Sequence, residues 1–260
     1  MELSSKETWL HRINPSIKLF VLVGVCIAVL FIDHLLLLIH TSLVVFILFF
    51  GFTGHSFKRI ILFTLPFFLI FLSTSSSMIL FGKGDAVLYQ WGLLKISEES
   101  IYKGVVVGFR GIIFAGLGLT FALTTRPVYL FYSLMQQLKM PPKYAYSFMA
   151  GLRLIPIMIE EFQTIQNAMR VRGVERQKGI KSIFFKLKAY SIPLLSQSIR
   201  RAHRIAVAME AKRFSNQKTR TFYYEFTLSK YDLIFILYFA LMLSLGYYVA
   251  MIYLLFYVAV

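Results

Sequence analysis

Long apolar segments separated by short polar breaks dominate the first half of the chain. A helix needs roughly 20 apolar residues to cross a hydrocarbon core of about 30 Å. Segments of nearly this length occupy residues 17–32, 35–52, 60–80, 104–124 and 231–260. The first two are slightly short, so they would cross only with local bilayer thinning or flanking side chains that reach the interface. The pattern predicts an all-α polytopic membrane protein with about five transmembrane helices.

A different pattern, typical of amphipathic helices, fills the stretch from Arg126 to Lys230. Apolar residues recur there at steps of three and four, with polar residues on the opposite face. This spacing predicts one long helix from Tyr146 to Arg172, ended by Gly173, and a second from about Lys181 to Lys212. Neither helix is stable in water with its apolar stripe uncovered. We therefore expect the two helices to cross, and Phe162 and Ile199 are the positions chosen to test close approach.

These two patterns divide the chain into three parts. Residues 1–125 form an N-terminal transmembrane region of about four spans, residues 126–230 a cytoplasmic region of amphipathic coupling helices, and residues 231–260 a C-terminal transmembrane helix. The central part is expected to begin with a short amphipathic helix from Pro127 to Leu138. Pro141 and Pro142 would close that helix, because proline cannot continue it.

Small and polar residues mark several places within the apolar half. The hydroxyl run from Ser73 to Ser77 and the small residues of the fourth span are expected at helix contacts, where they allow close approach. Residues 81–103 are expected to form a polar loop. Arg110 is the ionisable residue in the fourth span; it is a functional candidate by default, but near a span end it is better explained by reaching to the interface. The small residues of the fourth span are Gly104, Gly108, Gly111, Ala115, Gly116 and Gly118.

Composition and charge agree with a membrane protein and suggest its orientation. The chain is 58% hydrophobic and 15% charged, whereas soluble domains carry about 25% charged residues. Of the 28 Lys and Arg residues, nineteen lie between Arg126 and Lys230. Because cytoplasmic loops collect Lys and Arg, the N-terminus and the central region are expected inside and the C-terminus outside. A cysteine near Asp85 should then be labelled from outside, and one near Gln177 should not.

Several classes of function find no support in the sequence. The single cysteine, Cys26, lies in an apolar segment, and the five histidines have no metal-ligand spacing, so no metal site is expected. The chain has no phosphate-binding Gly-rich loop of the Walker type and no arrangement of a nucleophile with a base. Lys and Arg are not interleaved with aromatic residues as in single-strand binders, so nucleic acid is not an expected partner.

A short phrase occurs twice in the central stretch, each time at the end of a predicted long helix. The two copies are Ala168-Met169-Arg170-Val171-Arg172-Gly173 and Ala208-Met209-Glu210-Ala211-Lys212-Arg213. Two interpretations are open. Basic amphipathic helices commonly lie on anionic membranes, and a cation in the last turn suits the helix dipole. Alternatively, the two helix ends are docking tips for a partner, which periodicity alone neither favours nor excludes.

Four segments resemble one known family. They are Asn14 to Leu19 at the start of the first span, Leu152 to Glu161 in the central stretch, Ala168 to Gly173, and Ala208 to Phe214. Together they are similar to the transmembrane T component of energy-coupling factor transporters, and the similarity covers most of the chain. The resemblance implies a non-catalytic, multi-pass subunit in a bacterial plasma membrane. The polar residues of the central motif, Arg153, Glu160 and Glu161, become structural or functional candidates.

The same resemblance implies the partners. In that family the T component couples two cytoplasmic ABC ATPase domains to a membrane-embedded substrate-binding subunit, the S component, for uptake of vitamins, their precursors or metal ions. ATP is used by the ATPases, so this chain is expected to bind no cofactor. The alternative, a self-sufficient channel or secondary carrier, would require ionisable or broken-helix sites at mid-membrane, and the spans contain little beyond Arg110.

The family's two coupling helices each end in a three-residue signature centred on Arg that inserts into a groove of one ATPase. Val171-Arg172-Gly173 fits the first signature directly. Ala211-Lys212-Arg213 fits the second with a departure, since Lys stands in place of the usual Arg and Arg in place of a small residue. Either Lys212 acts as a point charge, or the register shifts by one residue to Arg213. Such an asymmetry would suit two unlike ATPase grooves.

Overall fold

The computed structural model describes residues 8–54, 56–82, 86–91, 94–173, 180–214 and 221–259. The chain forms two compact units: Met1–Ser133 with Phe226–Val260, and Leu134–Glu225. Asp85 and Gln177, the positions chosen for labelling, lie outside the described residues.

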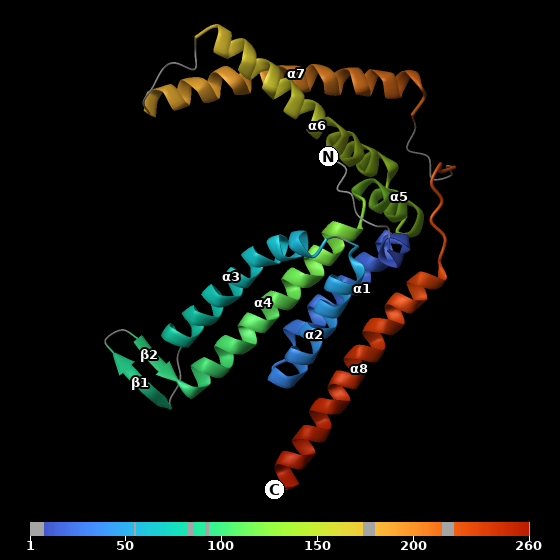
Figure 1. Ribbon diagram of the computed structural model, residues 1–260. Helices are drawn as coiled ribbons and strands as arrows, with labels where there is room; N and C mark the ends of the chain where they lie inside the picture. The colour runs from blue at the N-terminus through green and yellow to red at the C-terminus, as the bar shows by residue number, and fades with distance from the viewer. Residues whose placement is uncertain are drawn as a thin grey trace. The chain divides into compact units, whose positions relative to one another are not determined.

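The first unit is a bundle of apolar helices, which confirms the predicted all-α membrane fold. A short 3-10 helix, η1 (Trp9–Arg12), leads into α1 (Pro15–Leu30), whose N-cap is Asn14. The remaining helices of the bundle are α2 (Leu35–Phe52), α3 (Phe57–Phe81), α4 (Glu98–Thr124) and α8 (Lys230–Ala259). Figure 1 shows α3 lying along α4, a pairing that the contacts between them establish.

Four of these helices are long and apolar enough to cross a membrane by themselves. They are α2, α3, α4 and the described part of α8. The first predicted span corresponds to α1, which has only 16 residues and is about 24 Å long at 1.5 Å per residue. α1 nevertheless contributes Leu22, Val25 and Val29 to the bundle core. Crossing by α1 therefore stays a prediction, and with it the count of five.

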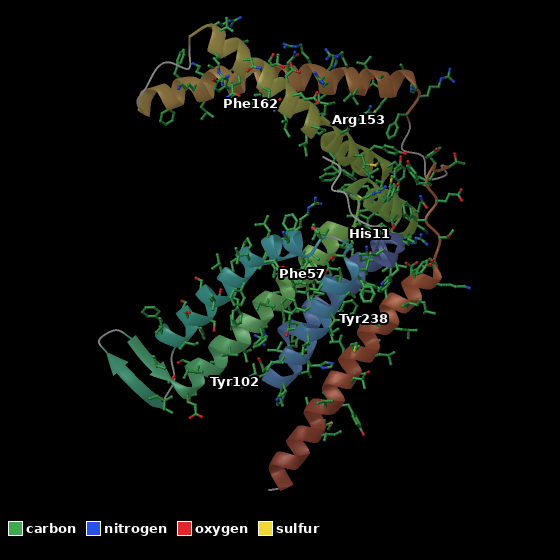
Figure 2. The ribbon with its side chains drawn as sticks, viewed as in Figure 1. His11, Phe57, Tyr102, Arg153, Phe162 and Tyr238 are labelled. Carbon is green, nitrogen blue, oxygen red and sulfur yellow. The ribbon has the colours of Figure 1, made fainter. Side chains whose placement is uncertain are left out.

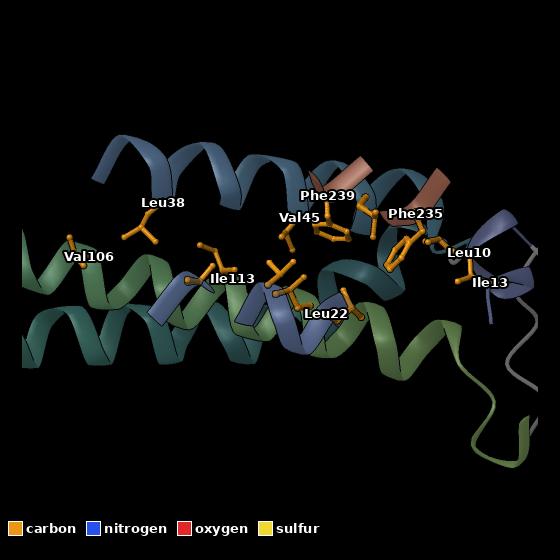
Figure 3. Close-up of a cluster of buried hydrophobic side chains, with 13 residues drawn as sticks. Leu10, Ile13, Leu22, Leu38, Val45, Val106, Ile113, Phe235 and Phe239 are labelled. Atoms are coloured by element: carbon orange, nitrogen blue, oxygen red, sulfur yellow. The ribbon is translucent and has the colours of Figure 1, made fainter. Parts of the chain in front are cut away.

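A continuous apolar core joins η1, α1, α2, α4 and α8. Figure 3 shows its buried side chains, which come from segments more than 200 residues apart in the sequence. Phe235 and Phe239 of α8 pack edge to face at 5.2 Å between ring centres, and Trp9 of η1 lies 6.3 Å from Phe235. The C-terminal helix is thus held against the start of the chain.

Some glycines of α4 allow neighbouring helices to approach closely, as the small-residue pattern predicts, whereas at other glycines of the same pattern no neighbouring helix comes close. A Cβ at Gly104 would lie 2.6 Å from Ile79 of α3, and one at Gly116 would lie 2.7 Å from Val45 of α2. Gly111 and Gly118 meet no atom within 4 Å. Ser75, from the hydroxyl run, is buried in the α3 to α4 contact.

The segment expected to be a polar loop has a secondary structure of its own. Strands β1 (Val87–Trp91) and β2 (Leu94–Ser97) pair antiparallel as a hairpin. Glu98 and Glu99 belong to the first turn of α4 and not to the loop, because Ser97 caps this helix and accepts from the amide of Ser100 at 3.2 Å. Acidic residues in a first turn also suit the helix dipole.

The second unit contains the two long amphipathic helices. These are α6 (Pro142–Val171) and α7 (Ile180–Ala211), and α5 (Pro127–Gln137) leads from the first unit into the second. Their bounds agree with the sequence pattern to within four residues. One expectation was wrong: Pro142 does not close the preceding helix but begins α6, since a proline in the first helical turn has no amide hydrogen to lose there.

Candidate functional site

The first tip, residues 171–173, ends α6 with its side chains directed into solvent. Val171 is 89% exposed, and Arg172 is exposed beside it. The amide of Arg172 donates to the carbonyl of Ala168 at 3.2 Å, and that of Gly173 donates to Arg170 at 3.1 Å. Gly173 has φ +77°, the left-handed conformation that ends helices and that glycine adopts without strain.

The second tip, residues 211–213, ends α7 by the same hydrogen bonds. The amide of Lys212 donates to Ala208 at 3.2 Å, and that of Arg213 donates to Glu210 at 2.8 Å. Arg213 has φ +54°, a left-handed conformation that costs a non-glycine residue about 1 kcal/mol. Phe214 completes the motif through its amide, which donates to Met209 at 2.9 Å.

The backbone therefore places the two tips in one register. Lys212 occupies the position of Arg172, and Arg213 the left-handed position of Gly173. Arg213 remains in this costly conformation because the residue after it is anchored: the ring of Phe214 packs edge to face on Tyr146 of α6 at 5.5 Å. The one-residue shift considered from the sequence would break this correspondence.

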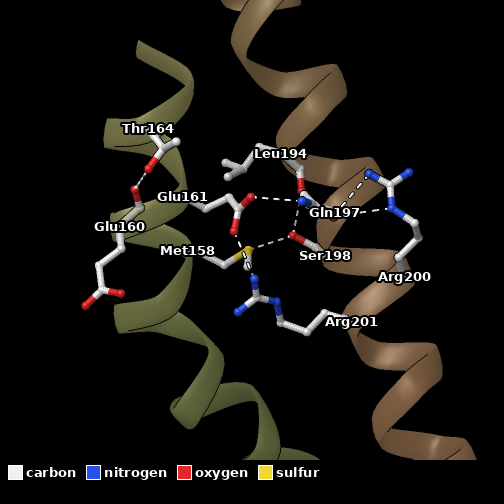
Figure 4. Close-up of polar contacts among 9 residues, drawn as sticks. All are labelled: Met158, Glu160, Glu161, Thr164, Leu194, Gln197, Ser198, Arg200 and Arg201. Atoms are coloured by element: carbon white, nitrogen blue, oxygen red, sulfur yellow. Dashed lines mark hydrogen bonds and ion pairs between the residues drawn. The ribbon is translucent and has the colours of Figure 1, made fainter. Parts of the chain in front are cut away.

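The helices that carry the tips cross each other, as their apolar stripes predict. At the crossing, Glu161 of α6 accepts from Gln197 of α7 at 3.0 Å and forms an ion pair with Arg201 at 2.9 Å (Figure 4). Ser198 donates to the sulfur of Met158 at 2.8 Å. The crossing is a mixed polar and apolar contact, which fixes the pairing of the helices more specifically than apolar packing does.

Of the two chosen test positions, Phe162 belongs to the contact between α6 and α7, whereas Ile199 does not. Phe162 packs edge to face on Tyr190 at 5.7 Å, and Ile199 is exposed. Each helix also contains a proline, Pro156 or Pro193, within two turns before its crossing contacts. A proline inside a helix removes one backbone hydrogen bond and commonly bends the axis, and both prolines lie close to the region in which the helices meet.

The remaining polar candidates of this unit separate into two groups. Glu161 is half-buried and belongs to the crossing, whereas Glu160 points away from α7 in Figure 4 and is exposed. Arg153 is also exposed on α6 (Figure 2). Arg201 of α7 also belongs to the crossing, because it forms the ion pair with Glu161.

Arg110 reaches the end of its span, as expected, but it makes specific contacts there. Its guanidinium donates to the carbonyl of Ile32 at 2.8 Å and to the carboxylate of Asp33 at 2.7 Å. The hydroxyl of Tyr102 donates to the Asp33 carbonyl at 2.9 Å. Arg110 and Tyr102 thus hold the turn between α1 and α2 against α4, which is a structural role.

The start of α1 contains a buried polar cluster that the sequence did not reveal. Asp232 of α8 accepts from the amides of Asn14 and Ser229, each at 2.7 Å. The side chain of Ser133 donates to the Asn14 side-chain oxygen. Lys18 is buried and donates to the carbonyl of Leu10 at 2.6 Å. The residues in these contacts are up to 218 positions apart, so no local sequence pattern predicts the contacts.

Among the described residues, no group of three or more His, Cys, Asp or Glu side chains is placed to hold a metal ion. The two exposed cationic tips, carried by the helices that cross, are the candidate contact residues of the second unit. The first unit is a bundle that includes helices long and apolar enough to cross a membrane.

Comparisons with known proteins identify the class. Residues 6–224 match the family model of CbiQ, described as a cobalt transport protein. The energy-coupling factor transporter transmembrane protein EcfT of Streptococcus equi subsp. equi is 28% identical over 232 residues, covering 82% of each chain. The EcfT of Limosilactobacillus fermentum is 29% identical over 240 residues, covering 87% of each chain. That of Listeria innocua is 29% identical over 239 residues, 83% of this chain and 84% of its own.

The match covers most of this chain and includes both tips. The chain therefore belongs to the CbiQ family of membrane transport proteins, which confirms the family resemblance found in its motifs.

Proposed function

We propose that this chain is the coupling subunit of an energy-coupling factor importer. In this function two cytoplasmic ABC ATPase domains bind the two tips, and their ATP-driven movement passes through α6 and α7 to a membrane-embedded S component. This chain itself catalyses no reaction and binds no nucleotide. The observation that carries the proposal is the matched pair of exposed cationic helix ends, which share one backbone hydrogen-bond pattern.

The arrangement suits the transmission of movement between two partners. The Glu161 to Arg201 ion pair and the Gln197 hydrogen bond join the two helices at one point, so a displacement of one tip moves the other helix as well. A half-buried ion pair resists separation because parting the charges would leave each in a poorly solvated place. The crossing is thus the element that would make two ATPase contacts act together.

We assign the S component to the apolar side of the same crossing. An open groove of about 480 Å³ runs along α6 and α7 there, lined mainly by Leu154, Ile155, Met158, Ile159, Phe162 and Leu194. An exposed apolar surface of this kind marks an interaction site. A membrane-embedded partner has apolar helices to cover it, whereas the ATPase side of the unit presents the charged tips. In this proposal the S component, and not this chain, selects the substrate, which is a vitamin, a vitamin precursor or a metal ion.

A self-sufficient channel or secondary carrier is the alternative from another class. It requires ionisable groups at mid-membrane that are available to a substrate. Arg110 is engaged with the turn after α1, and His40 of α2 is within 3.1 Å of the Met242 carbonyl of α8. Both are used in holding helices together, which favours the coupling function.

Isolation of the tagged chain from its own cells in mild detergent tests the proposal. We expect two ATPase chains, or one with two ATPase domains, to co-purify in fixed stoichiometry with a small membrane protein, and mass spectrometry identifies each. Uptake into vesicles should then require ATP. Transport by the isolated chain without any ATPase would establish the carrier alternative instead.

The proposed orientation places the tips in the cytoplasm and the hairpin outside, with five spans. Leu88 on β1 and Gln163 on α6 are both exposed and serve as labelling positions. In a Cys26→Ala background, an impermeant thiol reagent should label cysteine at Leu88 in intact cells. It should label cysteine at Gln163 only after the cells are opened. Labelling of Gln163 in intact cells would contradict the orientation and the coupling function with it.

The register of the second tip predicts unequal effects of its two basic residues. Lys212→Ala should weaken ATPase binding, because Lys212 occupies the position of Arg172. Arg213→Gly should preserve binding and stabilise the helix end by about 1 kcal/mol, since glycine adopts the left-handed conformation without cost. Affinity for the purified ATPases, measured for each variant, checks this. A large loss for Arg213→Gly with none for Lys212→Ala would show that Arg213 is the docking residue.

A further inference from the structure

A polar cavity of about 220 Å³ lies in the first unit, where α1 begins and α4 ends. Its lining includes Arg12, Lys18 and Arg126, together with His11, Thr125 and Tyr129. Of the described residues that line the cavity, three have basic side chains and none is acidic. A concave site with charges of one sign concentrates ions of the other sign.

The buried cation in this cavity is held by neutral groups. The Lys18 ammonium donates to the carbonyl of Leu10 at 2.6 Å, and it contacts the carbonyl and hydroxyl of Thr124 at 3.2 and 3.1 Å. Among the described residues, no carboxylate lies within ion-pair distance of it. The two carboxylate oxygens of Asp232, in the neighbouring polar cluster, accept instead from the amides of Asn14 and Ser229. The amine of Lys18 is thus held by hydrogen bonds to neutral groups.

The two arginines extend this positive charge to the mouth of the cavity. Both are exposed, and the Arg126 guanidinium lies 5.6 Å from the centre of the Tyr129 ring. Exposed guanidinium groups bind phosphate oxygens well, because their planar donors match two oxygens at once. The cavity therefore combines a buried basic side chain at its base with guanidinium donors suited to phosphate at its rim.

The position of the cavity along the helices indicates the source of the anion. α1 begins at Pro15 and α4 ends at Thr124, so the cavity lies at the ends of apolar helices and not along their middles. In a helical membrane protein the lipid headgroups surround the ends of the spanning helices, and basic pockets between transmembrane helices bind anionic lipid headgroups. We propose that this cavity is a binding site for a phosphate-bearing anion, supplied by the headgroup of an anionic phospholipid.

Direct binding measurements on the full-length chain in neutral detergent test the site. The probes are short-chain phosphatidylglycerol, short-chain phosphatidylcholine and soluble glycerol phosphate, titrated by calorimetry. The Arg12→Gln, Arg126→Gln double variant should bind phosphatidylglycerol about thirtyfold more weakly, given the usual contribution of a basic residue near anionic lipid. The matched control is Lys58→Gln with Arg59→Gln, which removes the same charge at the start of α3, outside the cavity lining.

The outcomes separate the alternatives. Preferred binding of phosphatidylglycerol, lost in the cavity variant and kept in the control, supports a lipid site. Equal binding of glycerol phosphate with the same dependence on Arg12 and Arg126 supports the phosphate site and assigns it a soluble ligand. Equal losses in the cavity variant and the control, or none in either, would overturn the proposal. If the double variant does not fold, Arg12→Gln alone should still weaken binding about fivefold.

Discussion

Replacing both tips, Arg172→Ala with Lys212→Ala, should abolish co-purification of the ATPases and ATP-driven uptake. A cation that inserts at the centre of an interface is typically worth about 2 kcal/mol or more on truncation, roughly a thirtyfold loss of affinity. The tips end different helices, so their effects should add to about 4 kcal/mol, or roughly a thousandfold. Affinity for the purified ATPases and uptake into vesicles measure the two losses.

The fold should survive this replacement. Both residues are exposed and follow the last helical residue of α6 or α7, where a charge contributes less than about 1 kcal/mol to the helix. The matched control, Lys143→Ala with Arg204→Ala, also removes one exposed cation from each helix but leaves the tips intact. Control and double variant should melt alike, and only the double variant should lose the ATPases. A double variant that retains them at wild-type stoichiometry would show that the tips are ordinary helix ends.

The elements of the fold could be predicted because their signals are local and periodic. Unbroken apolar runs indicate α2 and α8 almost to the residue, and the three-and-four spacing indicates α6 and α7. The hairpin was missed because its two strands are only five and four residues long, too short for alternation to be distinguished from a polar loop.

The candidate site was predictable in part for a related reason. Gly173 signals the end of α6, since glycine is the usual residue in the left-handed stop position. No such signal exists at Arg213, whose conformation depends on the contact between Phe214 and Tyr146, 68 residues apart (214 − 146). The Glu161 to Arg201 pair and the Asn14 to Asp232 hydrogen bond are likewise contacts between distant residues. Helical periodicity predicts which face of a helix such a residue occupies, but it does not predict which distant residue it contacts.

The second large effect is expected in the membrane bundle, from Gly104→Leu. Gly104 lies where α4 packs closely against α3, and an added Cβ would be 2.6 Å from the Ile79 side chain and 3.0 Å from the backbone carbonyl oxygen of Ser75. The side chain of Ile79 can turn aside, but the carbonyl belongs to a helix, so α3 must shift. Overpacking of this kind typically costs about 1 to 3 kcal/mol. The midpoint of thermal unfolding of the purified chain in detergent should fall by several degrees.

Gly118→Leu is the matched control, because it makes the same change in the same helix. A Cβ at Gly118 would meet no atom within 4 Å, and the residue is exposed. Leucine is also the better helix former, by about 0.8 kcal/mol in an exposed helix, so the melting temperature of this variant should stay level or rise. The two variants should change the melting temperature in opposite directions because α3 packs against Gly104 and no neighbouring atom lies within 4 Å of a Cβ at Gly118. Equal melting temperatures for the two variants would show that α3 and α4 do not pack through this face, and that the hairpin joining them is their main connection.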